Sequence, residues 1–174
     1  ILDKAFSFYY PENLENLQAN GARLVFIDAL RDYCLPRLDA LYIGGGFPEI
    51  FAAELEANYS LRQDIKQKIN EGLPVYAECG GLMYLGRRLW WQDRSYEMVG
   101  ALPFDVLMGR KPQGHGYVEF EVVEKNPFLK YGARVRGHEF HHSRIINLEM
   151  VPEIKFVYRL QRGYGINGQF DGLA

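Results

Sequence analysis

A cysteine followed by two glycines is the feature of this sequence best suited to chemistry. Cys79 follows the short apolar run 75–77 and precedes Gly80 and Gly81, after which a second apolar segment begins. A cysteine that only fills a core needs no glycine beside it, whereas a nucleophile raised on a sharp strand-to-helix turn does. We therefore interpret Cys79 as a candidate nucleophile.

Two physical effects would favour reactivity at this turn. A helix beginning at the thiol would stabilise a thiolate and lower the pKa of Cys79. The N–H of Gly80 would point to where an oxyanion forms. The alternative is that Cys79 is a buried, inert thiol, a common fate for cysteine. Cys34 precedes Leu-Pro, has no such setting, and reads as a loop or core thiol.

A second glycine cluster, Gly44-Gly45-Gly46, ends another apolar run, and Pro48-Glu49 follows as a helix start. Consecutive glycines let backbone N–H groups face a ligand without obstruction. We expect Gly45 or Gly46 to supply a second oxyanion donor beside Cys79. An ordinary turn is the plain alternative. Phosphate binding is another, although the G-x-x-x-x-G-K-[ST] pattern is absent.

Three of the four histidines lie in the segment 137–143, "GHEFHHS". Alternation along a strand would place Glu139 and His141 on one face. His141 could act as a base for Cys79, with Glu139 orienting it. A metal site would need a third ligand that the sequence does not assign, and no metal is predicted. The roles of His138 and His142 stay open.

The order of elements predicts an α/β fold. In the first half, expected strands alternate with expected helices, which implies a mostly parallel sheet with right-handed crossovers. In the second half, period-2 stretches between turn residues predict added antiparallel strands. The expected strands are 4–10, 22–30, 38–46, 73–78, 97–108, 116–124, 133–148 and 155–163; the expected helices are 11–21, 48–72, broken near 58–60, and 80–91.

Composition narrows the class of protein. The 174 residues suit one domain, 1–174, with a hydrophobic core. A net charge of −2 does not indicate a nucleic-acid partner, and no apolar run is long enough to span a membrane. Two cysteines fit a reducing, cytoplasmic setting. Because the chain lacks an initiator Met and stops abruptly at "GQFDGLA", we expect a fragment truncated at both ends.

Five segments resemble one family in order: "KAFSFYYPENL", "YIGGGFPEIF", "AECGGLMYL", "PQGHGYVE" and "GHEFHHS". The sequence is similar to the C-terminal glutamine amidotransferase domain of cobyrinic acid a,c-diamide synthase. The resemblance implies a flavodoxin-like three-layer fold of the class I glutamine amidotransferases. It implies Cys79 as the glutaminase nucleophile, with Gly45, Gly46, Phe47 and Gly80 at the oxyanion and glutamine site. No cofactor is expected in this domain.

The resemblance also implies partners outside the chain. An N-terminal ATP-binding synthetase domain of the same polypeptide would hold ATP and Mg and amidate carboxylates of a corrin precursor with ammonia from glutamine. The catalytic histidine of the family lies in a segment expected beyond Ala174. The alternatives are a self-contained cysteine hydrolase using His141, or a non-catalytic module without its base. The sequence leaves open whether the macrocycle is cobyrinate, hydrogenobyrinate or nickel-sirohydrochlorin, and whether the enzyme is a homodimer.

Overall fold

The computed structural model describes residues 1–174 and divides them into two compact units. The first comprises Ile1–Leu89 with Asp93–Leu102, and the second comprises Trp90–Gln92 with Pro103–Ala174. The sequence predicted one domain, 1–174, and did not anticipate this division. None of the helices combines the length and apolar character needed to cross a bilayer. The two units are described in turn.

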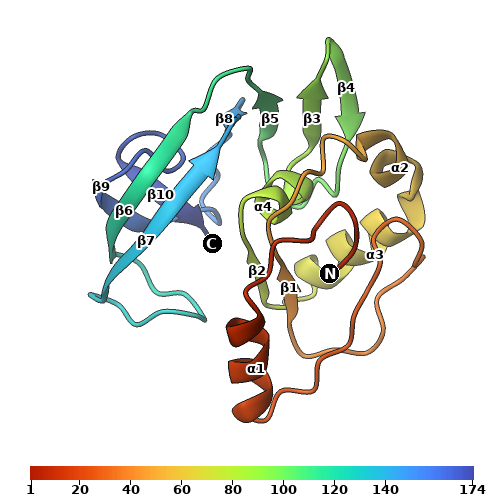
Figure 1. Ribbon diagram of the computed structural model, residues 1–174, viewed down its shortest axis with the longest axis horizontal. Helices are drawn as coiled ribbons and strands as arrows, with labels where there is room; N and C mark the ends of the chain where they lie inside the picture. Colours follow the sequence, from red (N-terminus) through yellow and green to blue (C-terminus); the bar gives the residue numbers. More distant parts are fainter. The chain divides into compact units, whose positions relative to one another are not determined.

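The first unit is built on a pair of parallel strands, β1 (Leu41–Ile43) and β2 (Val75–Ala77). Ile43 lies opposite Ala77 in the register, so both strands end at the same edge (Figure 1). The glycine cluster follows β1 and Cys79 follows β2. The parallel pairing therefore brings the two predicted motifs to one place.

Four helices accompany this pair: α1 (Pro11–Ala19), α2 (Ala52–Ala57), α3 (Tyr59–Asn70) and α4 (Gly80–Leu85). The predicted break in the second helical segment occurs at Asn58. The Asn58 side chain accepts a hydrogen bond from the Leu61 N–H at 3.4 Å and so caps α3. The core of the unit is apolar, and its fully buried side chains include Phe6, Ile43, Leu55, Leu61, Ile65 and Tyr84.

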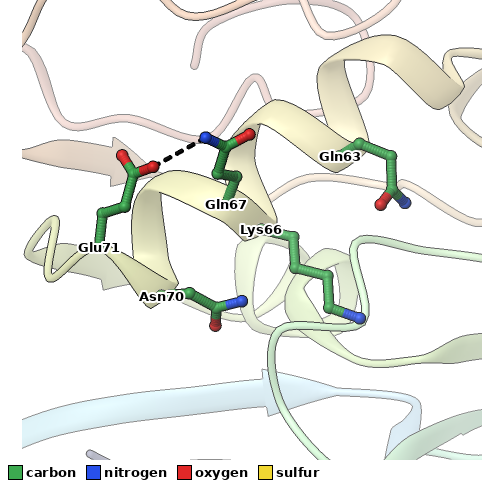
Figure 2. Close-up of a pocket in the computed structure, with 5 residues that line it drawn as sticks. All are labelled: Gln63, Lys66, Gln67, Asn70 and Glu71. Carbon is green, nitrogen blue, oxygen red and sulfur yellow. Dashed lines mark hydrogen bonds between the residues drawn. The ribbon is translucent and has the colours of Figure 1, made fainter.

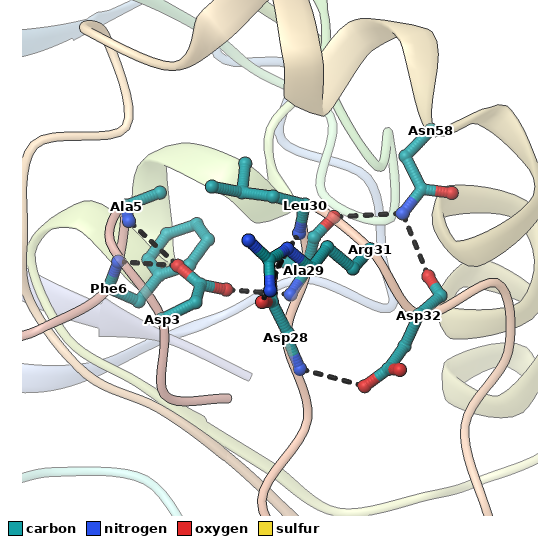
Figure 3. Close-up of polar contacts among 9 residues, drawn as sticks. All are labelled: Asp3, Ala5, Phe6, Asp28, Ala29, Leu30, Arg31, Asp32 and Asn58. Carbon is teal, nitrogen blue, oxygen red and sulfur yellow. Dashed lines mark hydrogen bonds and ion pairs between the residues drawn. The ribbon is translucent and has the colours of Figure 1, made fainter.

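The first two predicted strands, 4–10 and 22–30, are not regular strands. Only Phe8 forms a bridge, pairing with Gly45. The Asp3 carboxylate instead accepts the N–H groups of Ala5 at 2.7 Å and Phe6 at 3.0 Å, and that of Ala29 at 2.6 Å (Figure 3). A side chain that captures local backbone donors favours a turn over a strand ladder. Asp3 thereby ties the two segments together.

The predicted helix 80–91 is correct only for its first half. α4 ends at Leu85, and Arg88–Trp91 forms β3, followed by β4 (Arg94–Glu97). Between these strands, Gln92 and Asp93 have φ values of 50° and 61°. Two consecutive positive φ angles are typical of a tight hairpin turn. The apolar and aromatic residues of 88–91 fit a helix or a strand equally well, and the hairpin turn after them favours the strand.

The second unit contains an antiparallel sheet in the order β10-β9-β6-β7. Its strands are β6 (Gly114–Val122), β7 (Arg134–His141), β9 (Phe156–Arg162) and β10 (Phe170–Leu173). β5 (Asp105–Met108) pairs with β8 (Ser143–Ile146), also antiparallel. The predicted antiparallel character of the second half is confirmed, whereas β10 was not predicted. Val118, Val122 and Val157 are buried here.

Candidate active site

Cys79 occupies a strained turn between β2 and α4. Its φ is 49° and its ψ is −106°, a conformation that residues with a side chain rarely adopt. Its carbonyl accepts the Met83 N–H at 3.0 Å, which joins it to the first turn of α4. Such strain persists only where the surrounding structure enforces it, and it is concentrated at functional sites. The geometry is that of a nucleophile elbow.

The Gly44–Gly46 loop lies directly beside this elbow. The Gly81 N–H donates to the Gly44 carbonyl at 3.1 Å, and the Glu78 N–H donates to the Ile43 carbonyl at 3.0 Å. A methyl group added at Gly45 would lie 3.6 Å from the Cβ atom of Cys79. The predicted proximity of the loop and the cysteine is confirmed.

Close packing explains why glycines occupy these positions. A Cβ atom at Gly80 would lie 3.0 Å from the Pro48 ring and 3.1 Å from the Gly46 nitrogen. A Cβ atom at Gly46 would lie 2.9 Å from the carbonyl carbon of Ala5 and collide with its oxygen. Real Cβ atoms do not approach backbone this closely, so only glycine fits at Gly46 without displacing the chain.

The backbone N–H groups of Gly80 and Gly46 both act on the Cys79 thiol and lower its pKa. The side chain reaches solvent, yet enough protein surrounds the sulfur that burial is the largest influence on its pKa. Burial raises the pKa of Cys79, the Gly80 N–H lowers it, the charges of Glu49 and Glu78 raise it, and the Gly46 N–H lowers it. The net direction is upward.

The predicted lowering of the pKa of Cys79 is therefore wrong for this chain. α4 has only six residues, and its first N–H groups do not outweigh desolvation and the two carboxylates. The sulfur is held as a neutral thiol at neutral pH, and an attack on a carbonyl needs a base that removes its proton.

Phe47 continues the loop but uses its N–H elsewhere. That N–H donates to the Ala5 carbonyl at 2.9 Å, so it is not directed at Cys79. The ring contacts Phe8 edge-on, with the ring centroids 5.0 Å apart, and 46% of the residue is exposed. Of the predicted site residues, Phe47 can thus offer an apolar surface rather than a donor.

All four histidines belong to the second unit. His141 Nδ1 lies 2.8 Å from the Ser143 carbonyl and therefore donates to it, while Nε2 lies 3.7 Å from a Glu139 carboxylate oxygen. The same carboxylate accepts the N–H groups of Tyr164 at 2.7 Å and Gly165 at 2.9 Å. These contacts give "GHEFHHS" a structural role in tying β7 to the loop before β10.

A separate recess of about 370 Å³ lies along α3 (Figure 2). Its lining is polar, from Gln63, Lys66, Gln67, Asn70 and Glu71, and the Gln67 amide donates to Glu71 at 2.8 Å. Its lining residues all come from α3 and the end of that helix, and none of them is a cysteine, serine or histidine. The elbow at Cys79 is the candidate active site.

The family of CobB/CobQ-like glutamine amidotransferase domains matches residues 1–174 of the chain. The chain belongs to this family. A cobyrinate a,c-diamide synthase from Archaeoglobus fulgidus is 46% identical over 173 residues, which cover 99% of this chain and 37% of that protein. One from Magnetococcus marinus is 43% identical over 171 residues, covering 98% of this chain and 36% of that protein. The amidotransferase domain thus spans little more than a third of these relatives.

A solved structure supports the fold of this amidotransferase domain independently. A crystal structure of a glutamine amidotransferase superposes with a TM-score of 0.57, covering 86% of this chain and 74% of that one. The two share 18% sequence identity, so the likeness concerns the fold alone. The predicted α/β amidotransferase fold is confirmed, although its parallel sheet comprises only the two strands β1 and β2.

Proposed function

We propose that the chain is the glutaminase domain of a cobyrinate a,c-diamide synthase and that Cys79 is its nucleophile. The observation that carries the proposal is the placement of the Gly44–Gly46 loop directly against a cysteine held in a strained elbow, where the N–H groups of Gly46 and Gly80 both act on the thiol. Preorganised donors of this kind stabilise the oxyanion of acyl transfer. Family membership supports glutamine as the acyl donor.

The chemistry follows from this arrangement. The Cys79 sulfur loses its proton to a base and attacks the side-chain carbonyl carbon of glutamine, whose oxygen becomes an oxyanion bound by the Gly46 and Gly80 N–H groups. When the C–N bond breaks, the base returns the proton to the leaving nitrogen, and ammonia departs. Water then attacks the thioester, releasing glutamate and the thiol. Phe47 lines the glutamine side of the loop.

We propose that the base that deprotonates Cys79 is supplied by a residue outside 1–174. The raised pKa of Cys79 makes a base necessary, and the ring nitrogens of His141 are directed to Ser143 and Glu139. We propose a histidine that follows Ala174 in the complete polypeptide. No observation favours the alternative of a self-contained hydrolase using His141, and the absence of any histidine partner of Cys79 in this chain stays a prediction.

The complete enzyme would use the ammonia elsewhere. The relatives are longer by a segment that precedes or follows the matched region. We propose an N-terminal synthetase domain there, which binds ATP and Mg and activates the a and c carboxylates of a corrin precursor for amidation. We also propose a cytoplasmic location for this enzyme.

The test compares three proteins: the 174-residue chain, the complete polypeptide, and the complete polypeptide with Cys79→Ala. Glutamine hydrolysis should be strong only in the unaltered complete polypeptide. Alanine scanning of the histidines after Ala174 should find one whose loss abolishes it. Activity that survives Cys79→Ala would refute the nucleophile, and activity of the short chain that depends on His141 would establish the alternative.

A further inference from the structure

The Tyr9 side chain extends beneath the glycine loop that faces Cys79. Its hydroxyl oxygen accepts the Gly44 N–H at 2.7 Å and donates to the carbonyl of Ile1. A hydroxyl can do both at once because it carries one donor and two acceptor lone pairs. Burial raises the pKa of Tyr9 to about 12, so the hydroxyl keeps its proton throughout the physiological range. Tyr9 thus fixes the N–H of Gly44, the first residue of the loop.

The ring of Tyr9 also sets the space available to Gly44. A Cβ atom at Gly44 would lie 2.7 Å from Cζ of the Tyr9 ring and 2.8 Å from the Phe8 carbonyl oxygen. The ring is itself held by an edge-on contact with Tyr42, at 5.0 Å between centroids. The Tyr9 ring and the Phe8 carbonyl together leave no room for a side chain at Gly44.

The same side chains reach the other half of the elbow. The Tyr42 hydroxyl donates to the Glu78 carboxylate at 3.2 Å, and Glu78 immediately precedes Cys79. Tyr9 and Tyr42 pack against each other and thus connect the glycine loop to the nucleophile turn. A displacement of Tyr9 would change the position of the Gly46 N–H relative to the Cys79 sulfur.

We infer that Tyr9 is a positioning residue for glutamine hydrolysis: by accepting the Gly44 N–H, it orients the backbone that presents the Gly46 N–H to the oxyanion. The inference rests on the proposed function. Tyr9 does not touch the substrate. It acts through the loop, so its loss should weaken stabilisation of the transition state more than binding of glutamine.

The experiment uses Tyr9→Phe in the complete enzyme, with Tyr33→Phe as the matched control because Tyr33 is 74% exposed. The phenylalanine keeps the ring contacts and removes only the hydroxyl, which accepts the Gly44 N–H and donates to the Ile1 carbonyl. We expect kcat for glutamine hydrolysis to fall about ten- to hundredfold, less than the full loss of one oxyanion donor, with KM changed less than about threefold. Alkylation of Cys79 by iodoacetamide, which forms no oxyanion, should proceed at the unaltered rate.

A second variant perturbs the contact between Tyr9 and Gly44 by changing the glycine instead of the tyrosine. Gly44→Ala would push the Tyr9 ring away and should lower kcat in the same manner. Unchanged kcat in Tyr9→Phe, or an increase in KM alone, would overturn the positioning role. An equal slowing of iodoacetamide alkylation would also overturn it, because that result would indicate a general disturbance of the thiol. If Cys79→Ala abolishes hydrolysis while Tyr9→Phe is silent, only the role of Tyr9 fails and the proposed function stands.

Discussion

Replacement of Gly46 by alanine tests the oxyanion site most directly. The added methyl group would collide with the Ala5 carbonyl oxygen and lie 2.9 Å from both the Ala5 carbonyl carbon and the Phe6 Cα atom. All three are backbone atoms, which cannot rotate aside as a side chain can. The loop must therefore move, and the Gly46 N–H, which acts on the Cys79 thiol, moves with it.

The expected cost has two parts. Displacing one oxyanion donor should remove about 3–4 kcal/mol of transition-state stabilisation and lower kcat by about 10²–10³. The steric clash should destabilise the fold by about 1–3 kcal/mol, the usual range for overpacking. Glutaminase kinetics and the free energy of unfolding, both measured on the complete enzyme, separate the two effects. The variant should remain folded while its kcat is severely reduced.

Gly45→Ala is the matched control, since its methyl group would lie 3.4 Å from Phe8 Cβ and 3.6 Å from Cys79 Cβ, at ordinary contact distances. Its unfolding free energy should change by less than about 1 kcal/mol, the range of tolerated core swaps. Its methyl group faces the site, so glutamine KM can rise. Near-normal kcat in Gly46→Ala, or equal destabilisation of both variants, would refute the reasoning.

Two further outcomes are expected. In the 174-residue chain with Cys34→Ser, which removes the other exposed thiol, iodoacetamide should alkylate Cys79 slowly at neutral pH and faster only above the ordinary thiol range, because burial raises the pKa of Cys79. The folded thiol loses its proton at a higher pH than the unfolded thiol, so the free energy of unfolding should fall as pH rises past the ordinary thiol pKa. An alkylation rate whose pH midpoint lies below the ordinary thiol pKa would contradict this prediction. Arg62→Met should destabilise by about 1–3 kcal/mol, the cost of unsatisfied buried polar groups, because Arg62 is 4% exposed and donates to the carbonyls of Met98 at 2.8 Å and Glu56 at 2.9 Å. Arg31→Met, with a side chain 79% exposed, should change stability by less than about 0.5 kcal/mol; equal losses in the two arginine variants would count against the buried network.

Local patterns predicted the elements that position the nucleophile. The proline start and glycine stop identified α1, and a break in the second helical segment was predicted near residues 58–60. The break falls at Asn58, a residue type that favours helix caps. The apolar runs 4–10 and 22–30 have the composition of strands, yet the Asp3 carboxylate captures their backbone donors. That competition depends on a contact across 26 residues, which no local pattern contains.

The sequence predicted only part of the candidate site, because some of its contacts join residues far apart in the chain. Cys79 and the glycine cluster each end an apolar run, and parallel pairing brings such ends together. Tyr9 was not predicted, because its role depends on a hydrogen bond to Gly44, 35 residues away. The direction of the pKa shift of Cys79 was missed because its largest cause, burial of the sulfur, depends on packing that the sequence does not show, as does the closeness of the Glu49 and Glu78 charges.

The upward shift in the pKa of Cys79 makes hydrolysis by the proposed glutaminase depend on a base that reaches the thiol. The Gly46 and Gly80 N–H groups, which we propose as oxyanion donors, belong to the first unit together with Cys79. A thiol held neutral by burial and two carboxylates reacts little with water or stray electrophiles on its own. Hydrolysis then depends on whatever brings a base to the sulfur, and a raised pKa increases that dependence. Under the proposed function, a thiol that keeps its proton until a base is supplied would confine glutamine hydrolysis to the complete enzyme.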